Sequence, residues 1–165
     1  MKKIILLVGL FMLYQITYGQ CDKKITFKFN KLRVIKDGLA GQESPVEGTL
    51  SIDSGALILA VKVNEVFGVI TGAIKEIVIC DWSEFLKNGK AAYKALTKKE
   101  GQDTQNSFIV IESENGYTRI TFGSDPDEGS RLQFDVAEYE LMGDGNTTNK
   151  PAKQEIKKKE KKKKA

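Results

Sequence analysis

Hydrophobic and polar residues alternate along several short segments in the middle of the chain. A period of two places successive side chains on opposite faces, which is typical of a β-strand with one buried face. A short continuous run of branched apolar residues is typical of a strand buried on both faces. Segments of these two kinds occupy residues 25–29, 32–34, 46–52, 57–63, 67–71, 74–82 and 132–136.

The clearest element is a β-hairpin over residues 108–122, FIVIESENGYTRITF. The pair Asn115-Gly116 favours a type I′ turn, because both residues tolerate a positive φ. A two-residue turn at this point fixes which residues of the two arms lie opposite each other. The expected cross-strand pairs are Ile111 with Ile120, Ile109 with Phe122, and Glu112 with Arg119. The apolar pairs share one face of the hairpin and the charged pair lies on the other.

Two breaks in the alternation predict irregular positions in the sheet. The apolar face switches between Phe29 and Leu32, which predicts a β-bulge near Lys31. A second phase slip precedes Tyr139 in the last strand.

Residues 83–99 are predicted to form the one helix of the domain. The apolar side chains of this segment recur at helical spacing and would form a single stripe. They are Phe85, Ala92, Tyr93 and Leu96. Ser83 is a suitable N-cap. The alternative is a hairpin, because Asn88-Gly89 is a turn signal and a glycine inside a helix costs about 1 kcal/mol.

These elements predict an α+β fold that is mainly β. The expected architecture is an antiparallel curled sheet of about seven strands, either a sandwich or a partial barrel, with one helix covering a side or an end. The chain divides into a signal peptide (1–19), a single β-rich globular domain (20–142) and a lysine-rich tail (143–165) that we expect to be disordered.

The first nineteen residues have the composition of a secretory signal peptide. Lys2 and Lys3 precede a ten-residue apolar run, Ile4–Leu13, which is broken only by Gly9. A bilayer-spanning helix needs about 20 apolar residues, so this run is too short to span. Its length matches the hydrophobic region of a signal peptide. We therefore expect no transmembrane segment in the mature chain.

Cleavage between Gly19 and Gln20 fits signal peptidase, because it places the small residues Gly19 and Thr17 at positions −1 and −3. The alternative is a lipoprotein that is cut directly before Cys21 and anchored there. That cut would place Gln20 and Tyr18 where a lipoprotein signal needs a small and an aliphatic residue. A secreted or periplasmic location is therefore favoured over lipid anchoring at Cys21.

The chain contains two cysteines, Cys21 and Cys80. An exported protein meets an oxidising environment, so an even number of cysteines favours a disulfide between them. The alternative is that Cys80 is a small buried hydrophobic residue and Cys21 a free thiol near the N-terminus.

Charge is divided unevenly along the chain. Residues 150–165 contain nine lysines and two glutamates, whereas residues 20–149 contain fifteen Lys and Arg against twenty Asp and Glu. The basic character therefore belongs to the tail, and the folded domain is mildly acidic. The tail either binds an anionic surface such as phospholipid head groups or serves only as a solvated segment. Nucleic acid is disfavoured as a partner, because no aromatic residue is interleaved for base stacking.

The sequence predicts no catalytic residues, no cofactor and no metal site. It contains no histidine, which removes the commonest general base and the commonest metal ligand. Phosphate-binding glycine motifs are also missing from the sequence. The acidic loop 124–129 lacks the EF-hand spacing and is better interpreted as a turn than as a calcium site. Trp82 is expected to fill the core.

The function predicted from the sequence is an exported, non-enzymatic binding or interaction module of the bacterial cell envelope. Its partner would be an unidentified envelope protein, or an anionic surface contacted through the basic tail. One alternative is a carrier that holds a small apolar ligand inside a curled sheet. A weaker alternative is a carboxylate-based hydrolase.

Overall fold

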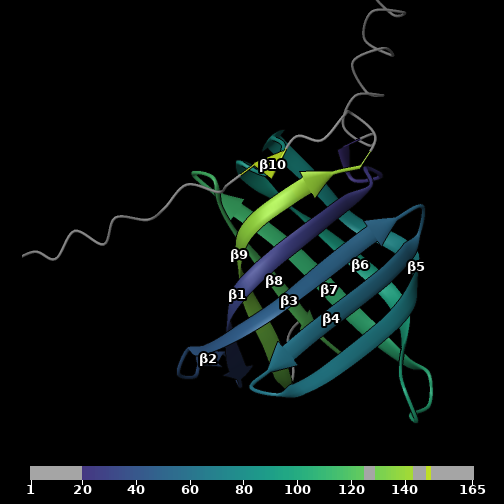
Figure 1. The fold of residues 1–165 in the computed structure, drawn as a ribbon. Helices are drawn as coiled ribbons and strands as arrows, with labels where there is room; N and C mark the ends of the chain where they lie inside the picture. The colour runs from purple at the N-terminus through teal and green to yellow at the C-terminus, as the bar shows by residue number, and fades with distance from the viewer. Residues whose placement is uncertain (1–19, 125–128, 143–147, 150–165) are drawn as a thin grey trace, which may run out of the picture.

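The structure is a computed structural model that describes residues 20–124, 129–142 and 148–149. Eight antiparallel strands form a closed barrel in these residues (Figure 1). The strands of the barrel are β1 (Ile25–Lys36), β3 (Ser44–Asp53), β4 (Ala56–Val63), β5 (Val66–Glu84), β6 (Asn88–Lys99), β7 (Gln105–Glu114), β8 (Tyr117–Gly123) and β9 (Ser130–Leu141). The predicted signal peptide, the residues at the centre of the acidic loop and nearly all of the predicted tail lie outside the described residues.

The strands follow one another around the barrel in chain order. β1 pairs with β3, and each strand from β3 to β8 pairs with the strand that follows it in the chain. β9 then pairs with β1 and closes the ring. Two short strands extend this ring: β2 (Leu39–Ala40) pairs with the end of β1, and β10 (Thr148–Asn149) pairs with the end of β9. Figure 1 shows β2 and β10 at opposite ends of the barrel. The predicted antiparallel curled sheet is confirmed, but it has eight barrel strands rather than about seven and closes completely, so it is neither a sandwich nor a partial barrel.

The predicted helix over residues 83–99 is wrong, and the described residues contain no α-helix. The segment instead forms the end of β5, a turn at residues 85–87 and strand β6, so the hairpin alternative is correct, although Asn88 and Gly89 begin β6 rather than form the turn. Gly89 has φ 137°, and a Cβ there would overlap the Asp81 carbonyl and lie 2.7 Å from the Cα of Trp82. The backbone at Gly89 is therefore incompatible with a helix. Pairing with both β5 and β7 overrides the helical spacing of the apolar residues.

The two strands predicted at 67–71 and 74–82 form one long strand, β5. Gly72 does not end the strand but allows a close approach to β6, since a Cβ there would lie 2.8 Å from the Leu96 carbonyl oxygen. The first part of β5 pairs with β4, and the later part extends beyond the start of β4 and pairs with β6. Register shifts relative to β6 bend the strand along this later part.

The hairpin predicted at 108–122 is confirmed as β7 and β8, in the expected register. Asn115 and Gly116 have φ 53° and 78°, as a type I′ turn requires. The predicted bulge is also present, because the register of β1 shifts between Phe29 and Lys31. The predicted slip before Tyr139 corresponds to a second shift in the β1–β9 pairing.

Alternate side chains from all eight strands fill the interior of the barrel with one continuous cluster. Within this cluster the rings of Phe29 on β1 and Phe134 on the neighbouring strand β9 have centroids 4.3 Å apart. The predicted core position of Trp82 is confirmed, and its ring meets Phe85 edge-on. The largest fully buried side chains among the described residues are Phe27, Phe134, Leu50, Leu57, Leu59, Ile109, Ile120, Thr97 and Thr118.

A disulfide between Cys21 and Cys80 fastens the N-terminal segment across one end of the barrel, with the two Cα atoms 5.9 Å apart. The buried hydroxyl of Tyr93 donates a hydrogen bond to the carbonyl oxygen of Cys21 at 3.2 Å. Further along the segment, Lys24 forms an ion pair with Asp53 at the β3–β4 turn. The predicted disulfide is therefore confirmed, and it indicates an oxidising, extracytoplasmic location.

The packing at Gly48 generates a prediction. A Cβ on Gly48 would overlap the ring of Phe29 and lie 2.5 Å from the carbonyl oxygen of Ala60. Gly48→Ala should therefore lower the free energy of unfolding by about 2 kcal/mol, as overpacking does. Gly68→Ala is the matched control, because a Cβ at Gly68 meets nothing within 4 Å. Urea unfolding of both variants tests this, and equal stabilities would contradict the packing described here.

The burial of Tyr93 predicts a loss of stability at alkaline pH. Burial raises the pKa of Tyr93 from 10.0 to about 12. Below pH 10 the tyrosine is neutral in both states, but between pH 10 and 12 it ionises first in the unfolded chain. The free energy of unfolding should therefore fall by about 2–3 kcal/mol over this pH range, since each pKa unit corresponds to about 1.4 kcal/mol.

Urea unfolding between pH 8 and pH 12 measures this effect against Tyr93→Phe as the control. At pH 8 the free energy of unfolding of the variant should be about 1 kcal/mol below that of wild type, because the hydrogen bond is lost. Above pH 10 the free energy of unfolding of the variant should fall less than that of wild type. Equal alkaline losses in the two proteins would show that Tyr93 does not titrate as its burial requires.

Candidate functional site: a groove on the outer face of the barrel

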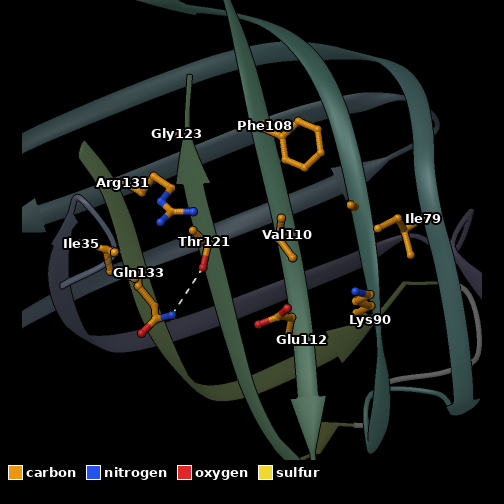
Figure 2. Close-up of a pocket in the computed structure, with 12 residues that line it drawn as sticks. Ile35, Ile79, Lys90, Phe108, Val110, Glu112, Thr121, Gly123, Arg131 and Gln133 are labelled. Atoms are coloured by element: carbon orange, nitrogen blue, oxygen red, sulfur yellow. Dashed lines mark hydrogen bonds between the residues drawn. The ribbon is translucent and has the colours of Figure 1, made fainter. Parts of the chain in front are cut away.

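A groove of about 490 Å³ lies on the outer face of the barrel. Strands β6, β7, β8 and β9 form its floor, with contributions from β5 and from the end of β1. Because Ile109 and Ile111 face the core, their neighbours Phe108 and Val110 face outward into the groove. Figure 2 shows these side chains on adjacent strands.

The floor of the groove is apolar. Phe108 and Val110 occupy its middle, and Ala92 lies beside them on β6 with only 1% of its surface exposed, although it is not part of the core cluster. Ile79 on β5 and Ile35 on β1 flank this floor on opposite sides (Figure 2). An outward apolar strip of this kind is unusual on a sheet face that is expected to be solvated.

Polar groups lie on two sides of the apolar floor. Arg131, Gln133 and Thr121 gather on one side, where the Gln133 amide approaches the Thr121 hydroxyl at 3.5 Å (Figure 2). Lys90 and Glu112 lie on the other side and are opposite each other in the β6–β7 register. The groove therefore presents both signs of charge, with Glu112 as the single carboxylate among its lining residues.

A second hollow of about 350 Å³ adjoins the groove and shares Lys90 and Glu112 with it. Tyr117 and Arg119 from β8 form part of its wall. The guanidinium carbon of Arg119 lies 4.9 Å from the centre of the Tyr117 ring, which is a cation–π contact. Asp81 and carboxylates of the β7–β8 hairpin add negative charge to this end.

The wall of the second hollow adjoins a buried carboxylate, Asp135, on β9. Its side chain is 8% exposed and pairs with Arg33 at 2.9 Å, and Arg33 also pairs with Glu43 at 2.6 Å. The Oδ1 atom of Asp135 has no hydrogen-bond partner among the described residues. Burial raises the pKa of Tyr117, and the carboxylate of Asp135 raises that pKa further. Tyr117 therefore stays neutral at physiological pH.

The lining of the groove combines an apolar floor with polar side chains of both charges. In the described part of the chain, no group of three cysteine or carboxylate side chains is placed to hold a metal ion. An apolar floor between polar groups of both signs fits a ligand with an apolar body and polar ends.

The residues singled out from the sequence do not lie in the groove. Cys21 and Cys80 are brought together at one end of the barrel, and Gln20 is the first described residue. Gly19 lies outside the described residues, so cleavage after it stays a prediction. Sequence reasoning did not identify the groove, although Phe108 and Val110 on the polar face of the predicted hairpin were a signal that could have drawn attention to it.

Comparison with known proteins gives no match: neither a protein-family model, nor a curated protein, nor a solved structure is significantly similar to this chain. Within the described residues, no helix is long and apolar enough to cross a membrane.

The Arg33–Asp135 pair predicts an asymmetry between two substitutions. Arg33→Gln leaves a buried carboxylate without its cation and should lower the free energy of unfolding by about 3 kcal/mol. Asp135→Asn should lower it by only about 1 kcal/mol, because Arg33 is more exposed and retains Glu43. Thermal and urea unfolding of both variants at pH 7 provide the measurement. A larger loss for Asp135→Asn would show that Arg33 rather than Asp135 is the group that depends on the pair.

Proposed function

We propose that this protein is an exported, non-enzymatic binding module of the bacterial cell envelope, and that it recognises its partner with the groove on the outer face of the barrel. The observation that carries the proposal is that the barrel interior is filled by side chains, whereas an open groove lies on the outer face. The side chains that face inward form a continuous buried cluster, whereas the groove lies outside and exposes apolar residues between charged ones.

The contents of the barrel interior favour this proposal over a carrier of a small apolar ligand. An eight-stranded barrel is just wide enough either to be filled by its own side chains or to hold one small ligand. Here inward side chains from all eight strands form one buried cluster, and within it the rings of Phe29 and Phe134 on the neighbouring strands β1 and β9 lie 4.3 Å apart. The interior is therefore better suited to stability than to ligand storage.

The chemistry of the groove favours binding over carboxylate-based hydrolysis. A glycosidase needs two carboxyl groups that face each other across a cleft. Glu112 is the single carboxylate that lines the groove, and its register neighbours on β6 and β8 are the cations Lys90 and Arg119. The groove therefore offers no second carboxylate to face Glu112, as that mechanism needs.

The disulfide supports an extracytoplasmic location, and we propose the periplasm or the external medium as the compartment. The partner is an envelope protein with an apolar segment and polar groups on either side of it. The lysine-rich segment 150–165 lies outside the described residues, and additional binding to an anionic surface through it stays a prediction.

Site-specific photo-crosslinking tests the proposed binding surface. A photoreactive amino acid in place of Val110 should give a discrete adduct with an envelope component when the full-length protein is incubated with envelope fractions. The same label in place of Ile58, an exposed residue on β4, serves as the matched control. Lys90→Glu in the Val110-labelled protein should reduce the yield several-fold, whereas Lys62→Glu on β4 should not. Identical adducts from both labels, or no adduct from Val110, would overturn the proposal.

A further inference from the structure

The charged side chains of the second hollow form one row across neighbouring strands. Successive registers place charges of alternating sign opposite one another on the outer face. The row consists of Asp81, Lys90, Glu112 and Arg119, which come from β5, β6, β7 and β8. Glu114, the last residue of β7, adds a third carboxylate to the lining.

The carboxylates of the hollow lack the ion pairs that this register offers. Asp81, Glu112 and Glu114 form no ion pair within the described residues, although cations lie opposite two of them. Three carboxylates line the hollow against the two cations Lys90 and Arg119, so its net charge is negative. The hollow is therefore complementary to a cationic ligand.

Two buried polar atoms beside the hollow also lack a partner. The Nε atom of Arg119 is buried and has no acceptor among the described residues. Asp135 lies opposite Arg119 at the end of the row, and its side chain is only 8% exposed. Its Oδ1 atom has no donor within the same residues. A buried polar atom without a partner is rare in a folded protein, so a further polar group belongs at this wall.

Strand β10 directs the chain towards the hollow. Because β1 occupies one side of β9 along its whole length, β8 and β10 both lie on the other side. Both are antiparallel to β9, so they run in the same direction along it. The partner of Asn149 in β9 is Tyr139, whereas the pairing of β8 with β9 begins at Asp135. The chain therefore leaves β10 in the direction of Tyr117, the first residue of β8 and a wall of the hollow.

The residues that follow β10 have the charge and the length to occupy the hollow. Residues 150–165, which we call the lysine-rich segment, lie outside the described residues and contain nine lysines and two glutamates. From Tyr117 on β8 to Asp81 on β5 the hollow spans three strand spacings, which is about 15 Å at about 4.8 Å each. About five extended residues cover this distance at about 3.3 Å per residue.

We propose that the lysine-rich segment binds in the second hollow of its own chain, with its ammonium groups among the carboxylates. A lysine ammonium is also a donor of the kind that Asp135 Oδ1 lacks, and a main-chain carbonyl of the segment is an acceptor for Arg119 Nε. Attachment through β10 raises the local concentration of the segment, which favours its own chain over a second copy.

Binding of the segment also affects the groove. The hollow and the groove share Lys90 and Glu112, so a bound segment covers that end of the groove and its release exposes it. This regulation of partner binding rests on the proposed function, whereas the binding of the segment in the hollow does not.

Paramagnetic relaxation enhancement in the full-length protein tests the proposal. A nitroxide is attached to an Ala165→Cys variant, and two amide signals are compared. Gly89 on β6 lines the hollow, and Leu57 on β4 is the matched reporter, because β6 and β4 lie equally far from β9 in opposite directions around the barrel. An unbound segment would broaden both signals alike. Gly89 should be broadened at least about twofold more than Leu57 at about 20 mM salt, and the difference should vanish near 0.5 M, where charges are screened.

Charge substitutions in the hollow show whether its carboxylates hold the segment. The combined variant Asp81→Asn, Glu112→Gln and Glu114→Gln should abolish the difference between the two signals. The matched control removes three carboxylates at the other end of the barrel, by Glu47→Gln, Glu65→Gln and Glu100→Gln, and should keep the difference.

Substitutions in the segment keep the proposal testable if the variant of the hollow is unstable. Replacing Lys157, Lys158 and Lys159 together by Gln leaves the described residues unaltered and should reduce the difference at least about twofold, because three of nine cations are lost.

Three results would overturn the proposal. One is equal broadening of Gly89 and Leu57 in the nitroxide-labelled protein. Another is a difference that persists without the carboxylates of the hollow. The third is the same difference in a mixture of nitroxide-labelled protein and unlabelled, isotope-enriched protein, since it would show that the segment binds a second copy. The test uses no partner, so its outcome is separate from that of the crosslinking experiment.

Discussion

The pairing of β1 with β9 is the constraint on which the rest of the structure depends. It joins the two ends of the sheet along the full length of both strands. Phe29 and Phe134 stack on the inner side of this seam, and Arg33 binds Asp135 on its outer side. Because residues about a hundred positions apart must meet, the loop-closure entropy is large, and contacts on both faces of the seam offset it.

Closure determines where an open apolar surface is left. A closed ring of eight strands has an interior of about the volume that its own side chains fill, so the large inward residues fill the barrel and the groove lies on the outer face. The segment across one end of the barrel reinforces this arrangement. The disulfide closes a loop with a sequence separation of 59 and should stabilise the fold by about 4 kcal/mol in the chain-entropy model. An apolar strip on the outer face then remains as the surface that folding does not use.

Local signals made part of this fold predictable. The β7–β8 hairpin follows from Asn115-Gly116 and strict alternation, and the bulge near Lys31 follows from a change of phase within a single strand. Each of these features is determined by residues close together in the sequence. The disulfide was predictable because the chain offers only one possible pairing.

The remainder depended on contacts between distant residues. Alanines and Tyr93 in residues 83–99 satisfy helical spacing as well as strand alternation, and only the two neighbouring strands decide between the two structures. Closure was not predictable because no local pattern specifies that β9 returns to β1. The groove takes its residues from six strands, so its composition follows from the registers of the whole barrel.

Amide hydrogen exchange along the β1–β9 seam is the most direct test of closure. In a closed barrel, the amides that cross this seam are hydrogen-bonded and should exchange about as slowly as those between β6 and β7. Exchange should slow on both strands together, around Phe27 and Tyr139 as well as around Val34 and Leu132. Seam amides that exchange as fast as an open strand edge, while the β6–β7 amides stay protected, would show an open curled sheet and contradict the filled, closed barrel.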